Sequence, residues 1–376
     1  MNWLVAVEAA QGAPEAPSLL LAGLRNPEAL VLLDLPKWDM CLRQARLAGV
    51  LASLQGRLAN CHLLERLPHV VRDHLRAARA IADAQQRSLR WELRCIRLAL
   101  AGVCDDFIVL KGSAYALAEL PPSLGRLQSD VDILVPLERI GAVEHALLTN
   151  GWQGVKLEEY DQFYYRKWSH ELPPLVHKER GTTIDVHHSI LPIMGRLHPD
   201  SRRLLAASKR IDGTSYWRLA DVDMVLHAAA HLFQDGDGSQ CLRGLLDLDG
   251  LMRAFSGGSR FWEHLQARAP EMELQRPMYY ALRYCDRYLG TPFPPEVLRY
   301  SATWAPPAPL LYCTDRLIHT VLHEDPRHPR HGSASRALLY LRSHWLRMPP
   351  MLLLRHLSHQ LSRRFTTKSP GAERPG

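Results

Sequence analysis

Two aspartates separated by one residue interrupt an apolar run in the segment SDVDILV, residues 129–135. Side chains alternate across a strand, so Asp130 and Asp132 project from one face, roughly 6–7 Å apart. Carboxylates at that separation repel each other unless a cation lies between them or water screens them. Mg²⁺ is often held by one or two carboxylates together with substrate phosphates. The pair therefore indicates a magnesium site, and the alternative is an edge strand with a solvated polar face.

A turn rich in small and basic residues lies upstream of this pair. Lys111, Gly112 and Ser113 follow the β-rich run FIVL and lead into the helix-forming run SAYALAEL. Glycine lets the backbone approach a ligand closely, and the first N–H groups of a helix attract phosphate. Downstream, Asp185 lies in the strand-like segment TTIDVHH with apolar neighbours. If these strands are neighbours in one sheet, three carboxylates and one phosphate-binding turn converge.

Residues 107–190 resemble the catalytic core of the nucleotidyltransferase superfamily that includes DNA polymerase beta. Its motif is a Gly-Ser turn, then Asp-x-Asp on the next strand, then a third Asp on a later strand. More narrowly, LKGSAYALAEL, Arg126 with SDVDILV, and IDVHHSI resemble a bacterial family of uncharacterised nucleotidyltransferases. That family pattern joins a Leu-Lys-Gly start, an Arg just before Ser-Asp-x-Asp, and an acidic-x-His strand.

The resemblance implies attack by an acceptor hydroxyl on the α-phosphate of a nucleoside triphosphate (NTP), with release of pyrophosphate. Asp130 and Asp132 would hold two Mg²⁺ ions, which stabilise the attacking and leaving oxygens. Asp185 would complete the nucleophile-side metal and help to take the hydroxyl proton. His187 shares a strand face with Asp185 and would contact phosphate or orient the carboxylate. The alternative for His187 is a half-exposed strand histidine.

The resemblance also implies a nucleotide-binding set around the turn. Gly112 and Ser113 would position the triphosphate, and Lys111 or Arg126 would add positive charge. Lys111 is equally well explained as the ion-pair partner of a nearby carboxylate. Sixteen residues separate Ser113 from Asp130, more than in compact members of the superfamily, which predicts a loop at the mouth of the site.

Two i,i+4 pairs lie farther along the chain. His227 and His231 have the spacing of metal ligands on one helix face, but no Glu follows His227 as a His-Glu-x-x-His motif requires. We expect this face to pack against the core, with a zinc site as the alternative. Arg243 and Asp247 predict a helix-surface ion pair, which by family resemblance would brace the helices against the sheet.

The elements that must position these residues predict an α+β protein. Residues 1–101 form a predicted N-terminal helical region, because 72–101 lack Pro and Gly and repeat apolar residues at helical spacing. Residues 102–219 form the predicted nucleotidyltransferase core with a small mixed β-sheet, including a hairpin of LVHK and TTIDVHH. Residues 220–325 are a predicted helical domain, and 326–376 a basic tail.

Composition limits the broad class of protein. The net charge is +7, but residues 326–368 contain eight Arg, one Lys and no acidic residue, which leaves 37 basic and 39 acidic residues elsewhere. The charge therefore gives no argument for a nucleic-acid groove in the body. Seven scattered cysteines without a Cys-x-x-Cys pair argue against a disulfide framework and a cysteine zinc site. With no signal-peptide pattern and no long apolar run, we expect a cytoplasmic protein.

The basic tail has two interpretations. Residues 335–365 interleave Leu, Trp and Met with Arg and His, so a basic amphipathic helix there would contact an anionic membrane or an acidic partner. Alternatively, its apolar residues pack on the helical domain while the arginines stay solvated. These residues are Leu338, Leu339, Leu341, Trp345 and Leu346.

Two functions follow from these patterns. The first is Mg²⁺-dependent transfer of a nucleoside monophosphate from an NTP to an unknown hydroxyl acceptor, which is a small molecule, a protein or an RNA. The second is a non-catalytic binding module of the same fold that docks to a membrane-associated assembly. Three retained strand aspartates favour the first, and nothing in the sequence identifies the acceptor or the preferred base.

Overall fold

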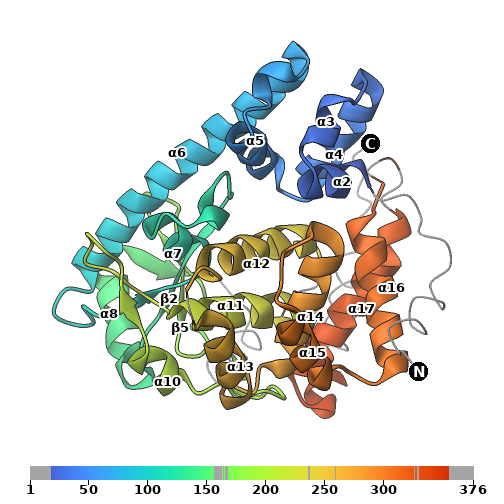
Figure 1. Cartoon of the computed structure of the whole chain (residues 1–376). Coiled ribbons are helices and arrows are strands. Elements are labelled where there is room, and N and C mark those ends of the chain that lie inside the picture. The colour runs from blue at the N-terminus through green and yellow to red at the C-terminus, as the bar shows by residue number, and fades with distance from the viewer. Residues whose placement is uncertain are drawn as a thin grey trace, which may run out of the picture.

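The computed structural model describes residues 18–155, 163, 165, 168–235, 238–258, 260–325, 327 and 330–354. Residues 18–101 are mainly helical, as predicted, and residues 1–17 of the predicted N-terminal region lie outside the described residues. The elements are α2 (Leu19–Arg25), α3 (Glu28–Val31), α4 (Leu35–Leu47), α5 (Leu51–Asn60), the 3₁₀ turn η1 (Leu64–Arg66) and α6 (His69–Ala99). The long helix α6 runs from the other N-terminal helices along one side of the sheet region (Figure 1).

A seven-stranded mixed sheet forms the centre of the protein. Its strands are β1 (Ile108–Val109), β2 (Asp130–Leu134), β3 (Trp152–Gly154), β4 (Leu175–His177), β5 (Thr183–His187), β6 (Lys209–Arg210) and β7 (Trp217–Arg218), in the order β3-β4-β5-β2-β1-β7-β6. β2 runs parallel to β5 and antiparallel to β1. The predicted α+β class and mixed sheet are therefore found.

The central strand of this sheet is β2, with three strands on each side. Apolar Val131 and Ile133 are buried, and Asp132 is 4% exposed. The alternative of an edge strand with a solvated polar face is therefore wrong. The predicted hairpin is confirmed, because β4 pairs antiparallel with β5 across a short turn.

Short helices connect the strands. They are α7 (Lys111–Leu117), η2 (Pro121–Ser123), η3 (Leu137–Arg139), α8 (Ile140–Thr149) and α10 (Ser201–Ala206). α7 begins directly after β1, at Lys111, whose φ of 46° lies in the left-handed region. A non-glycine residue in this region is strained, and such strain is common at functional sites. The chain thereby turns sharply from β1 into α7.

Helices make up the part of the chain that follows the sheet. They are α11 (Asp221–Ala230), the π-helical turn η4 (His231–Asp235), α12 (Cys241–Phe255), α13 (Phe261–Glu271), α14 (Gln275–Tyr284), the π-helical turn η5 (Cys285–Leu289), α15 (Pro295–Ser301), η6 (Ala302–Trp304), α16 (Ala308–Leu322) and α17 (Arg330–Arg347). No helix within the described ranges is long and apolar enough to cross a membrane.

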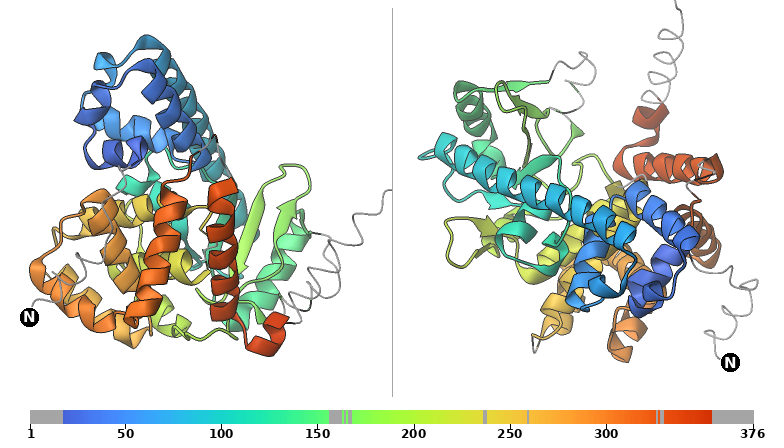
Figure 2. Two further views of the ribbon diagram at one scale, coloured as in Figure 1. Left: turned by 90° about the vertical axis from the view of Figure 1, so that its right-hand side faces the viewer. Right: turned by 90° about the horizontal axis from the view of Figure 1, so that it is seen from above.

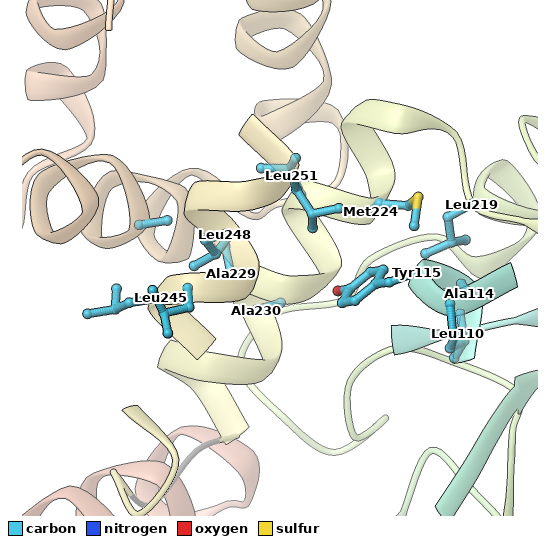
Figure 3. Close-up of a cluster of buried hydrophobic side chains, with 14 of the residues drawn as sticks. Leu110, Ala114, Tyr115, Leu219, Met224, Ala229, Ala230, Leu245, Leu248 and Leu251 are labelled. Carbon is cyan, nitrogen blue, oxygen red and sulfur yellow. The ribbon is translucent and has the colours of Figure 1, made fainter. Parts of the chain in front are cut away.

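Apolar side chains join this helical part to the strand-to-helix turn. Figure 3 shows Tyr115 of α7 pointing toward α11, with Met224 of α11 and Leu248 of α12 in the same buried cluster. Burial of such side chains contributes about 1.5–3 kcal/mol each. α11 and α12 therefore share one buried core with α7, and α12 contacts the 3₁₀ turn η2 that follows α7.

The helix α17 lies beside α16 and also contacts η4 (Figure 2, left). Of the apolar residues expected to pack there, Leu339 is buried and Leu346 is half-buried. Leu338, Leu341 and Trp345 are exposed, so packing explains only part of the apolar content of this helix. The predicted tail helix also included residues 355–365, which lie outside the described residues.

Candidate active site

Three aspartates from β2 and β5 converge at one point of the sheet. Asp132 lies opposite Asp185 in the parallel pairing, and Asp130 lies on the same face of β2, two residues earlier. One carboxylate oxygen from each of the three lies within 4.8 Å of the others. The convergence expected from the strand pattern is therefore present.

Asp132 is buried, and its carboxylate contacts a lysine and a histidine. Its Oδ1 accepts a hydrogen bond from Nζ of Lys111 at 2.6 Å and lies 3.0 Å from Nε2 of His187. Burial opposes ionisation of Asp132, but the charge of Lys111 and the contact with His187 outweigh it and hold the pKa well below its usual range. Lys111 thus is the ion-pair partner of a site carboxylate.

The environment of Asp185 shifts its pKa in the opposite direction to that of Asp132. Burial, followed by the nearby charges of Asp132 and Asp130, raises the pKa of Asp185 to about 7. Its Oδ1 is buried and has no hydrogen-bond partner among the described residues. A buried acceptor without a partner is costly, and a cation shared with the other two carboxylates would satisfy it. The donor set is all oxygen, which fits Mg²⁺.

A cavity of about 470 Å³ lies over the three aspartates. Its volume is in the range of small-molecule binding sites. Six of the predicted site residues line it, namely Lys111, Arg126, Asp130, Asp132, Asp185 and His187. Residues not predicted for the site also line it, including Tyr115, Gln128, His170, Glu171, Arg243, Tyr340 and Arg347.

Gly112 and Ser113 are buried and are not among the residues that line the cavity. A Cβ atom on Gly112 would be 2.0 Å from Nη1 of Arg126 and 2.7 Å from Oε1 of Gln128. The hydroxyl of Ser113 is buried and donates to Oε1 of Gln128 at 3.3 Å. The absence of a side chain at Gly112 thus makes room for Arg126. Contact of Gly112 and Ser113 with a triphosphate stays a prediction.

Arg126 forms a buried ion pair with a residue of α12. Its Nε donates to Oδ1 and Oδ2 of Asp247 at 3.2 and 3.0 Å. The predicted surface pair between Arg243 and Asp247 is therefore wrong, because the carboxylate points inward to Arg126. Arg243 lines the cavity instead. Asp247 nevertheless links the helical part to the site, as the family resemblance implied.

Two of the three histidines considered for the site, His187 and His227, are buried. His187 is 3% exposed, so the half-exposed alternative is wrong, and its Nδ1 lies 3.2 Å from Oε2 of Glu171. His227 is buried near Lys111 and Tyr115, so packing against the core is found for this residue. His231 is exposed and lines the cavity, so the expected packing does not hold for the whole helix face.

Sequence reasoning missed two parts of the cavity wall. His170 and Glu171 precede β4 in a segment without a regular apolar period, so nothing local marked them. Tyr340 and Arg347 belong to α17, whose position beside η4 depends on long-range packing. In the sequence, the i,i+7 spacing of Tyr340 and Arg347 indicated only that both side chains lie on one helix face.

Comparison with known proteins identifies a family. A family model described as "Uncharacterised nucleotidyltransferase" matches residues 34–290, which is more than half of the chain. The matched range includes the three aspartates and every cavity residue named above except Tyr340 and Arg347. None of the curated proteins and none of the solved structures matches the chain.

Proposed function

The chain belongs to the uncharacterised nucleotidyltransferase family, and we propose that it transfers a nucleoside monophosphate from an NTP to an acceptor hydroxyl in a Mg²⁺-dependent reaction. The observation that carries this proposal is the aspartate triad at the base of the cavity, with an unpartnered buried oxygen on Asp185. The order of the motif, with a Gly-Ser turn followed by the strand carboxylates, also supports placement in the DNA polymerase beta-like superfamily.

Asp130, Asp132 and Asp185 would hold the metal. Two bound Mg²⁺ ions would stabilise the attacking and leaving oxygens of the transfer. Asp185 would complete the site of the nucleophile-side metal and would help to take the proton of the acceptor hydroxyl. Lys111 and His187 keep Asp132 ionised and oriented through their contacts with Oδ1.

Cationic side chains would receive the triphosphate. Arg126, Arg243 and Arg347 line the cavity on the walls formed by the core, α12 and α17. Arginine binds phosphate through several N–H groups in a fixed planar geometry. Because Nε of Arg126 is engaged by Asp247, its orientation is already fixed before a ligand binds.

Radiolabel position tests the proposal directly. Protein incubated with Mg²⁺ and fractions of small molecules, proteins or RNA should transfer label from α-³²P-NTP but not from γ-³²P-NTP. Asp130→Asn should abolish the transfer. Transfer of γ-label would indicate a kinase instead, and absence of all transfer by folded protein across the four NTPs would contradict the proposal.

A second candidate function rests on the surface of α17. Leu338, Leu341 and Trp345 are exposed at i, i+3 and i+7, so they form one apolar stripe on a helix with several arginines. This stripe supports a module that docks to an anionic membrane surface. Co-sedimentation with vesicles containing phosphatidylserine tests it: binding that is lost in Trp345→Ser supports docking, and the absence of binding at low salt rejects it.

A further inference from the structure

The imidazole of His187 lies between two carboxylates. Its Nε2 is 3.0 Å from Oδ1 of Asp132, and its Nδ1 is 3.2 Å from Oε2 of Glu171. Ionised carboxylates only accept hydrogen bonds, and a neutral imidazole carries a single N–H. With a neutral ring, one of the two contacts therefore joins two acceptor atoms, and a second ring proton or a metal ion between these atoms would relieve their repulsion.

We assign the ring N–H of His187 to Nε2, which faces Asp132. Oδ1 of Asp132 also accepts from Nζ of Lys111 at 2.6 Å, and two donors on one oxygen fit an ionised carboxylate. The lone pair of Nδ1 then faces Glu171, whose side chain is 20% exposed. Two lone-pair atoms at this distance repel each other, and a cation between them removes the repulsion.

The spacing of these two atoms matches neighbouring ligands of a tetrahedral metal. Zinc binds histidine nitrogen and carboxylate oxygen at about 2.0–2.2 Å, so two ligands at the tetrahedral angle lie about 3.3 Å apart. The distance from Nδ1 of His187 to Oε2 of Glu171 is 3.2 Å. His170 offers a third donor atom nearby, since one ligand atom from each of the three residues lies within 4.8 Å of the others.

The backbone keeps the three ligands together. Glu171 forms an antiparallel bridge with His187, and the N–H of His188 donates to the carbonyl of His170 at 2.8 Å. All three side chains line the cavity, so an ion can enter from it. We propose that His170, Glu171 and His187 form a second metal centre, which binds a divalent ion of the Zn²⁺ type with one coordination position open to the cavity.

This centre differs from the aspartate triad in its donors. Two imidazoles and one carboxylate favour zinc-type ions, whereas three carboxylates favour Mg²⁺. A ligating His187 would donate its other N–H to Asp132, an arrangement that fixes the orientation of both groups. The ion would thereby hold Asp132 in place for the triad. The proposal stands on these contacts and does not depend on nucleotidyl transfer.

Metal content tests the proposal without an activity assay. Tag-free protein is loaded with Zn²⁺, dialysed against metal-free buffer and measured by elemental analysis. We expect about one zinc per chain in the wild type and in Asp185→Asn, and less than about a tenth of that in His170→Ala and Glu171→Gln. His145→Ala, at an exposed histidine of α8, is the matched control and should retain zinc. Circular dichroism verifies that each variant folds.

Cobalt provides the second readout. Co²⁺-loaded wild type should show the intense visible absorption of a tetrahedral or five-coordinate ion, and Glu171→Gln, which preserves the shape of the side chain, should not. Folded wild type that takes up neither ion overturns the proposal and assigns the Glu171 contact to a shared proton. Zinc that is retained by both ligand variants, or lost from Asp185→Asn, overturns it as well because the ion then lies elsewhere.

Discussion

Asp132 and Asp185 lie opposite each other on the parallel strands β2 and β5, yet their carboxylates have contrasting partners. Oδ1 of Asp132 contacts Lys111 and His187, whereas Oδ1 of Asp185 is buried without a partner among the described residues. Their pKa values consequently move in opposite directions, well below the usual range for Asp132 and to about 7 for Asp185. Pairs of carboxylates separated in this way divide acid–base and electrostatic roles in enzymes.

Asp185→Asn should stabilise the metal-free protein at alkaline pH. Since the pKa of Asp185 rises from 3.8 to about 7 on folding, its contribution to stability is present below the lower value and is lost as pH rises through the upper one. At pH 8 in EDTA, removal of this charge should add about 1–3 kcal/mol to the free energy of unfolding. Urea denaturation of the wild type and of Asp185→Asn measures this difference in the free energy of unfolding.

The gain from Asp185→Asn should shrink as pH falls from 8 to 5, because the wild-type carboxyl becomes protonated in the fold. Saturating Mg²⁺ should stabilise the wild type and leave the variant unchanged. A variant less stable than the wild type at pH 8 in EDTA would show that Asp185 is satisfied by another group.

Mg²⁺ affinity should depend on pH through Asp185. Below about pH 7 a proton competes with the cation for this carboxylate. The Mg²⁺ dissociation constant should therefore rise up to about tenfold per pH unit from pH 7 to 5 and level off above pH 8. Isothermal titration calorimetry gives the constants. A flat profile in the wild type over this range would contradict the assignment.

Asp247→Asn should destabilise the fold. It removes the charge that compensates buried Arg126, and breaking a buried ion pair on one side costs about 3–5 kcal/mol. Asp39→Asn, which breaks the exposed pair of Asp39 with Arg43, is the matched control and should leave chemical denaturation unchanged. Equal, small effects for the two variants would mean that Arg126 has other partners.

Gly112→Ala and Gly141→Ala should have opposite effects. The added methyl at Gly112 would lie 2.0 Å from Nη1 of Arg126, whose guanidinium is held by Asp247, so overpacking should cost about 1–3 kcal/mol. Gly141 lies in the exposed first turn of α8 with nothing within 4 Å, and alanine there should gain about 0.5–1 kcal/mol. Thermal denaturation compares them, and a stabilising Gly112→Ala would refute the close packing.

Local patterns were sufficient for the elements that carry the triad. The alternation in SDVDILV and TTIDVHH predicted β2 and β5, and the periodicity of residues 72–101 predicted α6. β6 and β7 escaped prediction because each has only two residues and neither contains the β-branched residues that marked the equally short β1.

Side-chain contacts between residues far apart in the sequence also could not be predicted from local patterns. Asp247 lies four residues from Arg243 and 121 residues from Arg126, and only tertiary packing places it against Arg126. The position of α17, which brings Tyr340 and Arg347 to the cavity, is fixed in the same way. The aspartates on β2 and β5 could thus be predicted from the sequence, whereas the residues of the surrounding cavity walls could not.

Anomalous diffraction from a crystal containing Mn²⁺ and a non-hydrolysable NTP would locate the metal ions that we place at the three aspartates, because Mn²⁺ replaces Mg²⁺ in oxygen sites. We expect two peaks between the triphosphate and the carboxylates of Asp130, Asp132 and Asp185, about 3.5–4 Å apart. A bound nucleotide with no metal at these carboxylates, or with its α-phosphate facing away from Asp185, would contradict this expectation.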